Sequence, residues 1–421
     1  MSVNVSYSEA VRYLYSLGNE LKIGAKFGLE RIQALLAELG NPESGQRFVH
    51  VAGTNGKGST CAMIANVLRH AGFRTGLYTS PHLIEPTERI QLCGSAVSER
   101  EFARLFEMVH AAAERLDSQP SYFETVTAMA LVFFQEQCDI SVLEVGLGGR
   151  LDATNVVSPV VCAITPIAFD HESFLGNTLE AIASEKAGIL KRGVSVVVAK
   201  QAPEAEVVIA ERAHQLGCEL LHIGDAPMTD IDASAHGSSF SLGGERYECG
   251  LPGRHQMENA ATAILVCRWL GVSVPAIQAG LASVRWPGRL ELVSREPDFI
   301  LDGAHNPAGA GALAAYIREF CGSRLVWIVY GAMRDKAIDE VTSQLFPLAD
   351  RLIVTAPSFP RALRPEAILE MSSHANAVIA ETVGQAIEMA QTASKDAVVF
   401  FTGSLFLVGE ARGLLHKIGV S

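Results

Sequence analysis

The sequence predicts an α/β protein in which a mostly parallel sheet with a phosphate-binding loop is followed by a smaller α/β domain. Apolar strand patterns alternate with helical patterns along most of the chain, which indicates βαβ units. A glycine-rich turn with a lysine joins the first of these strands to a helix. A second alternating series begins after Arg289. These three observations predict one domain over residues 1–290 and another over residues 298–421.

The expected elements follow from apolar periodicity and turn residues. In the first domain, strands are expected at 48–51, 140–145, 160–165 and 195–199, and helices at 60–70, 99–115, 125–137 and 203–216. The pair Gly243-Gly244 separates two short runs, which predicts a hairpin of 239–242 with 245–249 and a small antiparallel patch. In the second domain, strands are expected at 299–302, 325–330, 351–355 and 397–402, with 291–297 as the connection between the domains.

The letters GTNGKGS follow the first expected strand and open its helix. Gly53, Gly56 and Gly58 allow the backbone to curl around an anion, and the helix N-terminus and Lys57 supply positive charge. The usual phosphate loop places a serine or threonine directly after the lysine, where its hydroxyl binds Mg²⁺. Here Gly58 takes that place and Ser59 comes one position later, so another residue is expected to supply an oxygen. The alternative is an ordinary glycine-rich turn.

Composition limits the classes of function. The chain has 421 residues, 48% hydrophobic and 19% charged, and a formal net charge of −12, which argues against a nucleic-acid-binding face. Neither a membrane-spanning apolar run nor a secretory signal is visible, so we expect a cytoplasmic protein that contacts no membrane. The eight cysteines include no C-x-x-C pair, which favours free thiols in a reducing compartment over a zinc site.

Polar residues lie at the ends of three strand-like runs. Glu144 ends a buried strand before a glycine-rich loop, which suits a Mg²⁺ ligand, although a cap or salt bridge is the alternative. Ser80 follows a strand-like run and could supply the hydroxyl that Gly58 lacks, although Ser-Pro alone indicates only a turn. Asp170 and His171 follow a third strand, and His171 is either a metal ligand or a structural histidine.

Three further segments carry polar groups. Lys186 lies in an apolar, helix-like setting, and on the residues alone a pair with Glu185 or another carboxylate is favoured over a functional amine. The segments 253–259 and 286–289 lie near the expected domain junction, where Arg289 could neutralise phosphate charge. The segment 302–306 ends a strand with an acid, a histidine and an amide. Turns and caps are the alternative for each segment.

Together these motifs resemble the folylpolyglutamate synthase family, including bifunctional dihydrofolate synthase/folylpolyglutamate synthase, among the Mur-ligase-like, ADP-forming amide ligases. The ordered matches run from residue 53 to residue 410: GTNGKGS, SPHL with ERI, YFE, LEVGLGGRLDATN, DH, EKAGI, HQxxNA, WPGR, DGAHNP, DK at 335–336, and GSLFLVGE. The resemblance implies a Mur ligase-like fold, with a P-loop-type ATP-binding domain over 1–290 and a Rossmann-like, glutamate-binding domain over 298–421.

The resemblance also implies roles for individual residues. ATP is held by Asn55, Gly56, Lys57, Gly58, Ser59, Asn259, Arg289 and Asp302. Mg²⁺, with two ions expected, is bound by Ser80, Glu144 and His171. Lys186 matches the lysine that the family carries as a carbamate. The pterin substrate lies near Tyr122, Phe123, Glu124, Leu151, Asp152 and Ala153. His305 lies near the transferred phosphate and the amino acid, and the catalytic set is Lys57, Lys186, His171 and His305.

The implied reaction joins L-glutamate to dihydropteroate or reduced folates through an acyl phosphate, with release of ADP and phosphate by a monomeric enzyme. The nearest alternative is a peptidoglycan Mur ligase or a cyanophycin-synthetase-like enzyme. The residues before Gly53 are too few for the additional domain that Mur ligases of the usual plan carry there. A non-catalytic ATP switch is a different class, which needs Lys57 and Glu144 but not Lys186 or His305.

Three places depart from the family pattern. Pro166 precedes the Asp-His pair where small residues are more usual, and Arg364 interrupts a familiar stretch that begins at Arg361. Residues 18–26 match no motif, which leaves pterin specificity open if the pterin rests against them.

Overall fold

The computed structural model describes residues 5–18, 28–225, 227–334, 337–371 and 374–419. The chain divides into two compact units, and each is described by itself. Unit 1 comprises Met1–Ile167, Thr178–Pro227 and Glu258–Ser283, and unit 2 comprises Ala168–Asn177, Met228–Met257 and Val284–Ser421. The boundary expected between residues 290 and 298 divides the chain differently, and it stays a prediction.

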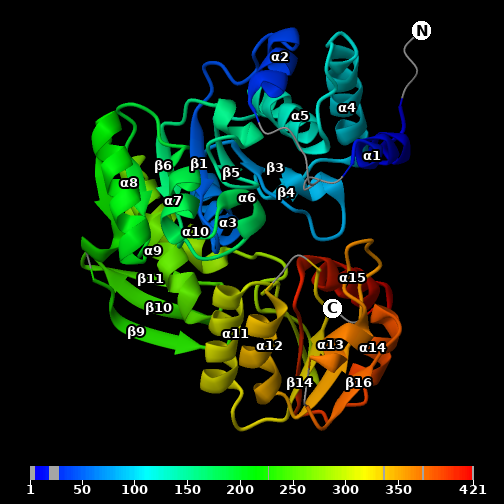
Figure 1. Cartoon of the computed structure of the whole chain (residues 1–421). Coiled ribbons are helices and arrows are strands. Elements are labelled where there is room, and N and C mark those ends of the chain that lie inside the picture. The colour runs from blue at the N-terminus through cyan, green and yellow to red at the C-terminus, as the bar shows by residue number, and fades with distance from the viewer. Residues whose placement is uncertain (1–4, 19–27, 226, 335–336, 372–373, 420–421) are drawn as a thin grey trace. The chain divides into compact units, whose positions relative to one another are not determined.

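Unit 1 is built on one eight-stranded, mostly parallel sheet (Figure 1). In order across the sheet its strands are β4 (Ser95–Ala96), β3 (Ile90–Leu92), β2 (Thr75–Tyr78), β5 (Ile140–Glu144), β1 (Phe48–Ala52), β6 (Val161–Ile164), β7 (Val196–Val198) and β8 (Leu220–His222). The six neighbouring strands β2, β5, β1, β6, β7 and β8 pair in parallel, whereas β3 and β4 add an antiparallel edge beside β2. The parallel arrangement brings the carboxyl ends of β1, β2, β5 and β6 to one edge, where ligand sites of such sheets lie.

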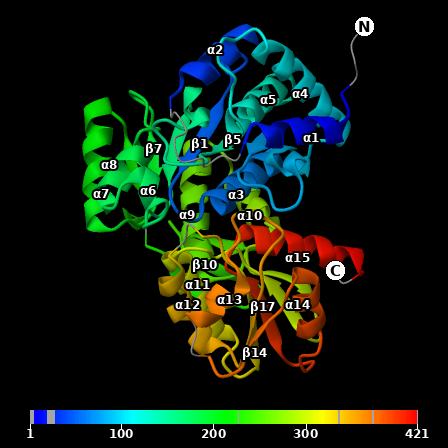
Figure 2. The same cartoon turned by 45° about the vertical axis from the view of Figure 1, so that its right-hand side comes forward.

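Helices cover both faces of this sheet. They are α1 (Tyr7–Ser16), α2 (Glu30–Glu38), α3 (Lys57–His70), α4 (Glu99–Ala113), α5 (Tyr122–Gln137), α7 (Leu179–Ala187), α8 (Pro203–Leu216) and α10 (Val274–Ser283), and α9 (Arg254–Trp269) contains residues of both units. The crossovers β1–α3–β2 and β2–α5–β5 run in opposite directions across the sheet, and right-handed connections therefore place α3 and α5 on opposite faces (Figures 1 and 2). Helix α10 packs closely on α3, because a Cβ on Gly280 would meet Val67.

The main core of unit 1 lies around α5. This helix is apolar almost all round because the sheet lies on one side of it and α2 and α4 lie on the other. Its Phe134 and Met129 are fully buried with Phe48 of β1 and Phe102 of α4. Burial of this kind contributes about 1.5–3 kcal/mol for each large apolar side chain, so α5 anchors the helical layer above the strands that carry the site.

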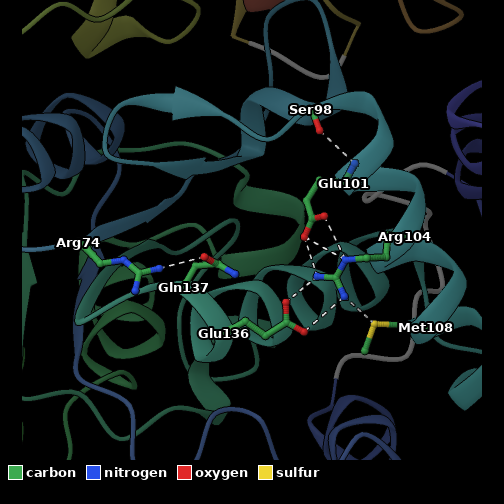
Figure 3. Close-up of polar contacts among 7 residues, drawn as sticks. All are labelled: Arg74, Ser98, Glu101, Arg104, Met108, Glu136 and Gln137. Atoms are coloured by element: carbon green, nitrogen blue, oxygen red, sulfur yellow. Dashed lines mark hydrogen bonds and ion pairs between the residues drawn. The ribbon is translucent and has the colours of Figure 1, made fainter.

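Polar contacts tie α4 to α5 at the surface (Figure 3). Ser98 caps α4 by accepting the Glu101 N–H, and Arg104 lies between two carboxylates, with Nη2 2.6 Å from Glu101 Oε1 and 2.6 Å from Glu136 Oε2. These side chains are partly exposed, and exposed ion pairs contribute about 0–1 kcal/mol each. The cluster therefore aligns two helices and adds little stability.

Unit 2 contains a six-stranded sheet and a three-stranded sheet. The larger sheet has the order β12 (Glu291–Ser294), β13 (Asp298–Leu301), β17 (Val398–Thr402), β14 (Val326–Tyr330), β15 (Arg351–Val354), β16 (Ala377–Ile379), with only β12 antiparallel. The smaller sheet is the antiparallel set β11 (Glu245–Cys249), β10 (Gly237–Leu242), β9 (Thr229–Ser234). Three helices lie in crossovers that run in one direction across the larger sheet: α11 (Pro307–Phe320), α12 (Ile338–Leu345) and α13 (Pro365–Glu370). The crossover that contains α14 (Val383–Ala390) runs in the opposite direction. The last helix is α15 (Leu405–Lys417), and α6 (Glu172–Leu175) is a single turn.

The α/β fold class and the hairpin are confirmed, whereas some boundaries were wrong. The segment 291–297 is not merely a connection, because Glu291–Ser294 forms β12 and pairs with β13 through backbone hydrogen bonds. Strand β9 was missed, because its polar, mostly exposed sequence TDIDAS carries no strand signal of its own. Helix α3 begins at Lys57 and α5 begins at Tyr122, each three residues before its expected start, 60 and 125. Both follow directly after the N-cap residues, Gly56 and Ser121, and precede the apolar pattern.

Candidate active site

The phosphate loop is held in shape by two glycines. Gly53 has a φ of 147°, and a Cβ there would collide with Thr165 Oγ1. Gly56 is the left-handed N-cap of α3, with a φ of 84°, and a Cβ there would collide with Asn259 Oδ1. Only glycine fits either position without strain. The structure therefore places Asn259, an expected ATP contact, directly against the loop.

Pro166 accounts for part of the loop's hydrogen bonding. Its carbonyl accepts the N–H groups of Thr54 and Asn55 at 3.0 and 3.3 Å. A proline serves here because only its carbonyl is used. The N–H groups that follow the N-cap Gly56 belong to the start of α3, where a helix lacks internal acceptors and attracts anions. Lys57, the first residue of α3, donates from Nζ to the Thr54 carbonyl at 3.1 Å.

Glu144 and Ser80 lie together at the carboxyl ends of adjacent strands. Glu144 ends β5 in register with Val51 of β1 and is only 6% exposed. Its Oε2 accepts the Ser80 N–H at 3.1 Å, and Ser80 follows β2, the other neighbour of β5. Within the described residues, no group of three or more His, Cys, Asp and Glu side chains is arranged to hold a metal ion. The carboxylate and hydroxyl oxygens of this pair are of the hard type that Mg²⁺ takes.

Lys186 is buried beneath the phosphate loop. It lies in α7, is 4% exposed, and its Nζ donates to the Gly53 carbonyl at 2.7 Å. The alternative partner suggested by the sequence, Glu185, instead binds Arg150 at 2.8 Å. The structure thus directs the Lys186 amine to the loop and the neighbouring carboxylate to another residue.

Glu124 has structural partners at the start of α5. Its Oε2 accepts the Ser121 N–H at 2.7 Å, and the Ser121 hydroxyl accepts the Glu124 N–H, which completes a capping box. Arg31 Nε lies 3.2 Å from both carboxylate oxygens. The sequence analysis missed Arg31, and the S-x-x-E spacing at 121–124 could have indicated the cap.

Tyr122 and Phe123 lie on either side of this helix start. Tyr122 is buried, with Arg89 5.1 Å from its ring centroid and Tyr15 stacked at 5.9 Å. Phe123 is half-buried and faces the turn after β5, because a Cβ on Gly146 would lie 2.6 Å from Phe123 Cζ. The structure therefore brings Phe123 close to the strand end that carries Glu144.

Asp152 is the centre of a buried hydrogen-bond network in the same region. It caps the 3-10 helix η2 (Ala153–Val156), its Oδ1 accepts the Thr154 N–H at 3.0 Å and the Thr154 hydroxyl at 2.5 Å, and its Oδ2 accepts the Leu147 N–H at 2.9 Å. Burial raises the pKa of Asp152, and these hydrogen bonds oppose the rise. The adjacent expected pterin contacts are the half-buried Leu151 and the buried Ala153.

His50 lies behind this network, and the sequence analysis missed it. It is fully buried in β1, and its Nε2 is 2.8 Å from Thr154 Oγ1. Burial, followed by the charge of Lys191, lowers the pKa of His50 to about 3. A histidine inside the otherwise apolar strand FVHVA was the signal that could have identified it.

His50 is expected to make the protein less stable in acid. The unfolded chain protonates this histidine near pH 6.5, whereas the folded protein does so only at about pH 3. Between these values only the unfolded state takes the proton, so the free energy of unfolding falls by about 1.4 kcal/mol for each pH unit below 6.5. Denaturant unfolding from pH 7 to pH 5 should show a shallower fall in His50→Gln, and the same slope as the native chain in His214→Gln, which alters an exposed histidine of α8. Parallel slopes in all three proteins would contradict this.

In unit 2, Arg289, which precedes β12, and Asp302, which follows β13, lie at the same turn. Asp302 is 7% exposed and accepts the N–H groups of Leu290 and Ala304, both at 3.0 Å. Burial raises its pKa, and Arg289 opposes the rise. A Cβ on Gly303 would collide with Arg289 Nη1, so the guanidinium lies against the turn. Burial and the charge of Arg289 also lower the pKa of His255 to about 4. His255 is not among the residues that the sequence analysis assigned to the site.

Asp170 joins the two expected catalytic histidines of unit 2. Its Oδ2 is 3.2 Å from Asn306 Nδ2, 3.6 Å from His305 Nε2 and 3.9 Å from His171 Nε2. His305 Nδ1 donates to the Gly303 carbonyl at 2.7 Å, which fixes the ring. His171 has a φ of 52° and precedes α6. His171 therefore lies in unit 2, whereas Ser80 and Glu144 lie in unit 1.

Three expectations from the sequence remain. Arg364 is the N-cap residue of α13. The DK motif at 335–336 and residues 19–26 of the unmatched segment lie outside the described residues. Across the described helices, none is both long and apolar enough to cross a membrane.

Known proteins resemble this chain over nearly its whole length. Residues 51–267 match the Mur ligase middle domain, and residues 288–405 match the Mur ligase, glutamate ligase domain. The chain is 37% identical over 426 residues to the dihydrofolate synthase/folylpolyglutamate synthase of Bacillus subtilis, covering 97% of this chain and 98% of the relative. It superposes on Escherichia coli FolC in complex with DHPP and ADP with a TM-score of 0.88, at 34% identity and 98% coverage of both chains. It also superposes on Mycobacterium tuberculosis folylpolyglutamate synthase complexed with ADP and AMPPCP with a TM-score of 0.89, at 31% identity and with 97% of this chain and 98% of that chain covered. The chain therefore belongs to the folylpolyglutamate synthase family of Mur-ligase-type proteins, as its motifs predict.

Proposed function

We propose that this protein is an ADP-forming ligase that joins L-glutamate to dihydropteroate, to reduced folates, or to both. The observation that carries the proposal is the group at the carboxyl ends of the unit 1 strands: the phosphate loop with Lys57, the buried Lys186 on the Gly53 carbonyl, and the Glu144–Ser80 pair. The relatives named above, a dihydrofolate synthase/folylpolyglutamate synthase and ligand complexes with ADP, support the same chemistry.

In the first step, the carboxylate of the pteroate or folate attacks the γ-phosphate of ATP, which gives an acyl phosphate and ADP. Negative charge gathers on the transferred phosphoryl group, and catalysis consists mainly of positioning and charge neutralisation. The first N–H groups of α3 bind phosphate oxygens, and Lys57 and Arg289 supply cationic charge. Asn259 holds the nucleotide beside the loop.

Magnesium fits the residues of this site. Ser80 and Glu144 offer hard oxygen ligands at adjoining strand ends of unit 1. When bound, Mg²⁺ neutralises phosphate charge and orients the γ-phosphate. We further propose a second ion, supported by a carbamate on Lys186. The burial of Lys186 and its contact with the phosphate loop support this assignment, because a carbamate formed there would offer oxygen ligands to a cation beside the loop.

In the second step, the amine of L-glutamate attacks the acyl phosphate, an amide forms, and phosphate leaves. Unit 2 contains the Mur ligase, glutamate ligase domain. We assign His305 to the incoming amino acid and the transferred phosphate, with its ring held by the Gly303 carbonyl and Asp170. We also propose that the enzyme works in the cytoplasm as a monomer.

The testing experiment measures ADP release by the purified protein with MgATP and L-glutamate. It is run with 7,8-dihydropteroate and, separately, with tetrahydrofolate. Turnover with both establishes a bifunctional synthase, and turnover with only one assigns the enzyme to that acceptor. Binding of ATP without glutamate-dependent ADP release in either reaction would overturn the proposal and favour a nucleotide switch.

A further inference from the structure

We propose that His50 and Thr154 are positioning residues for the folate side of the site, where they hold Asp152 and the turn that follows Glu144. The proposal rests on the proposed function, which places the pterin near Phe123 and Asp152. It adds two residues that touch neither nucleotide nor acceptor and act only through Asp152.

The directions of the hydrogen bonds follow from the groups present. Both carboxylate oxygens of Asp152 accept backbone N–H groups, which favours the ionised form that only accepts, so the Thr154 hydroxyl donates its proton to Oδ1. That hydroxyl oxygen can then only accept from His50, so His50 carries its proton on Nε2. His50 Nδ1 is buried and has no hydrogen-bond partner within the part of the chain that the structure describes. A lone pair there is less costly than an unsatisfied N–H, which favours the same tautomer.

Asp152 transmits this constraint to the turn after β5. Its Oδ2 accepts the Leu147 N–H at 2.9 Å. A Cβ on Gly146 would lie 2.6 Å from Phe123 Cζ and 3.2 Å from Asp152 Oδ2. The turn, the ring and the carboxylate are therefore packed without room for one methyl group, and a small displacement of Asp152 must move Gly146 or Phe123.

The hydrogen bonds from His50 to Thr154 and from Thr154 to Asp152 form a relay, and its burial makes it sensitive to the loss of one hydroxyl. His50 and Thr154 are fully buried and Asp152 is 5% exposed, so solvent does not compete for these groups in the folded protein. Valine has nearly the shape of threonine but lacks the hydroxyl. The change to valine therefore removes the hydrogen-bond acceptor of the His50 N–H and one of the two Thr154 donors to Asp152 Oδ1. Serine keeps the hydroxyl and loses only a methyl group.

The decisive experiment compares Thr154→Val with Thr154→Ser. Steady-state kinetics with 7,8-dihydropteroate should show a KM for this acceptor raised at least about 10-fold in Thr154→Val, whereas the KM for ATP stays within about 3-fold. Thr154→Ser should keep both KM values near those of the native enzyme. Equal KM values for dihydropteroate in the two variants would overturn the proposal. It would also be overturned if Thr154→Val lowered only the fraction of protein that is active and left this KM unchanged.

A second measurement uses the unaltered protein. Nitrogen-15 NMR of histidine-labelled enzyme should show His50 as a neutral imidazole protonated on Nε2 throughout pH 6 to 8, with His50→Gln assigning the signal. A Nδ1-protonated or charged ring would overturn the relay even if the enzyme is active. Failure of the unaltered enzyme to use either acceptor would instead overturn the proposed function, and the acceptor role of the relay would fall with it.

Discussion

Replacing Glu144 by glutamine is expected to lower kcat at least about 100-fold while the protein remains folded. Glutamine keeps the size of the side chain and can still accept the Ser80 N–H, which the Glu144 carboxylate accepts at 3.1 Å. It removes the negative charge that a Mg²⁺ ion between this strand end and the phosphates requires. ADP release at a series of MgCl₂ concentrations measures the effect, and the apparent Mg²⁺ requirement should rise as kcat falls.

Glu136→Gln is the matched control for this change. It makes the same chemical replacement on α5, at a carboxylate that binds Arg104 at the surface (Figure 3). Its kcat and Mg²⁺ dependence should equal those of the native enzyme, because the loss of one exposed ion pair costs about 0–1 kcal/mol of stability. Near-native activity of Glu144→Gln at limiting Mg²⁺ would contradict the metal assignment.

The buried parallel strands could be predicted because both faces of such a sheet are covered, which leaves short continuous apolar runs in the sequence. The parallel strands β8 and β16 were missed, because they lie at sheet edges and are only half-buried. Strand β12 could not be predicted in this way. Its side chains are only half-buried, and it forms by antiparallel pairing with β13, an interaction between backbones that leaves no periodic signal in Glu291–Ser294. The early starts of α3 and α5 have a similar cause, because caps depend on Gly56 and Ser121 rather than on apolar period.

In the candidate site, local sequence patterns predict some residues, whereas the partners of others depend on contacts between residues far apart in the sequence. A loop with Lys57 and a strand ending in Glu144 are local patterns, and the register of Val51 with Glu144 places them together. The partner of Lys186 depends on a carbonyl far away in sequence, that of Gly53, which no local pattern indicates. The role of His50 likewise depends on Thr154, a residue that joins it only in the folded sheet.

Replacing Lys186 by alanine is expected to lower kcat about 1,000-fold, and small carboxylates such as acetate or formate should restore part of the activity. The side chain is 4% exposed and lies against the Gly53 carbonyl, so its removal opens a space beside the phosphate loop that a small anion can enter. ADP release with dihydropteroate, measured over a range of acetate concentrations, tests the carbamate assignment.

Lys191→Ala separates a carboxylate role from a structural one. The Lys191 amine also donates to a backbone carbonyl, that of Asn155 at 3.0 Å, but this carbonyl belongs to η2 and not to the phosphate loop. If Lys186 acts only by holding the Gly53 carbonyl, both variants should lose stability and neither should respond to acetate. If Lys186 carries a carbamate, acetate should restore activity to Lys186→Ala alone. Absence of rescue by any small carboxylate would leave the amine as a loop tether, and the second metal ion would lose its proposed ligand.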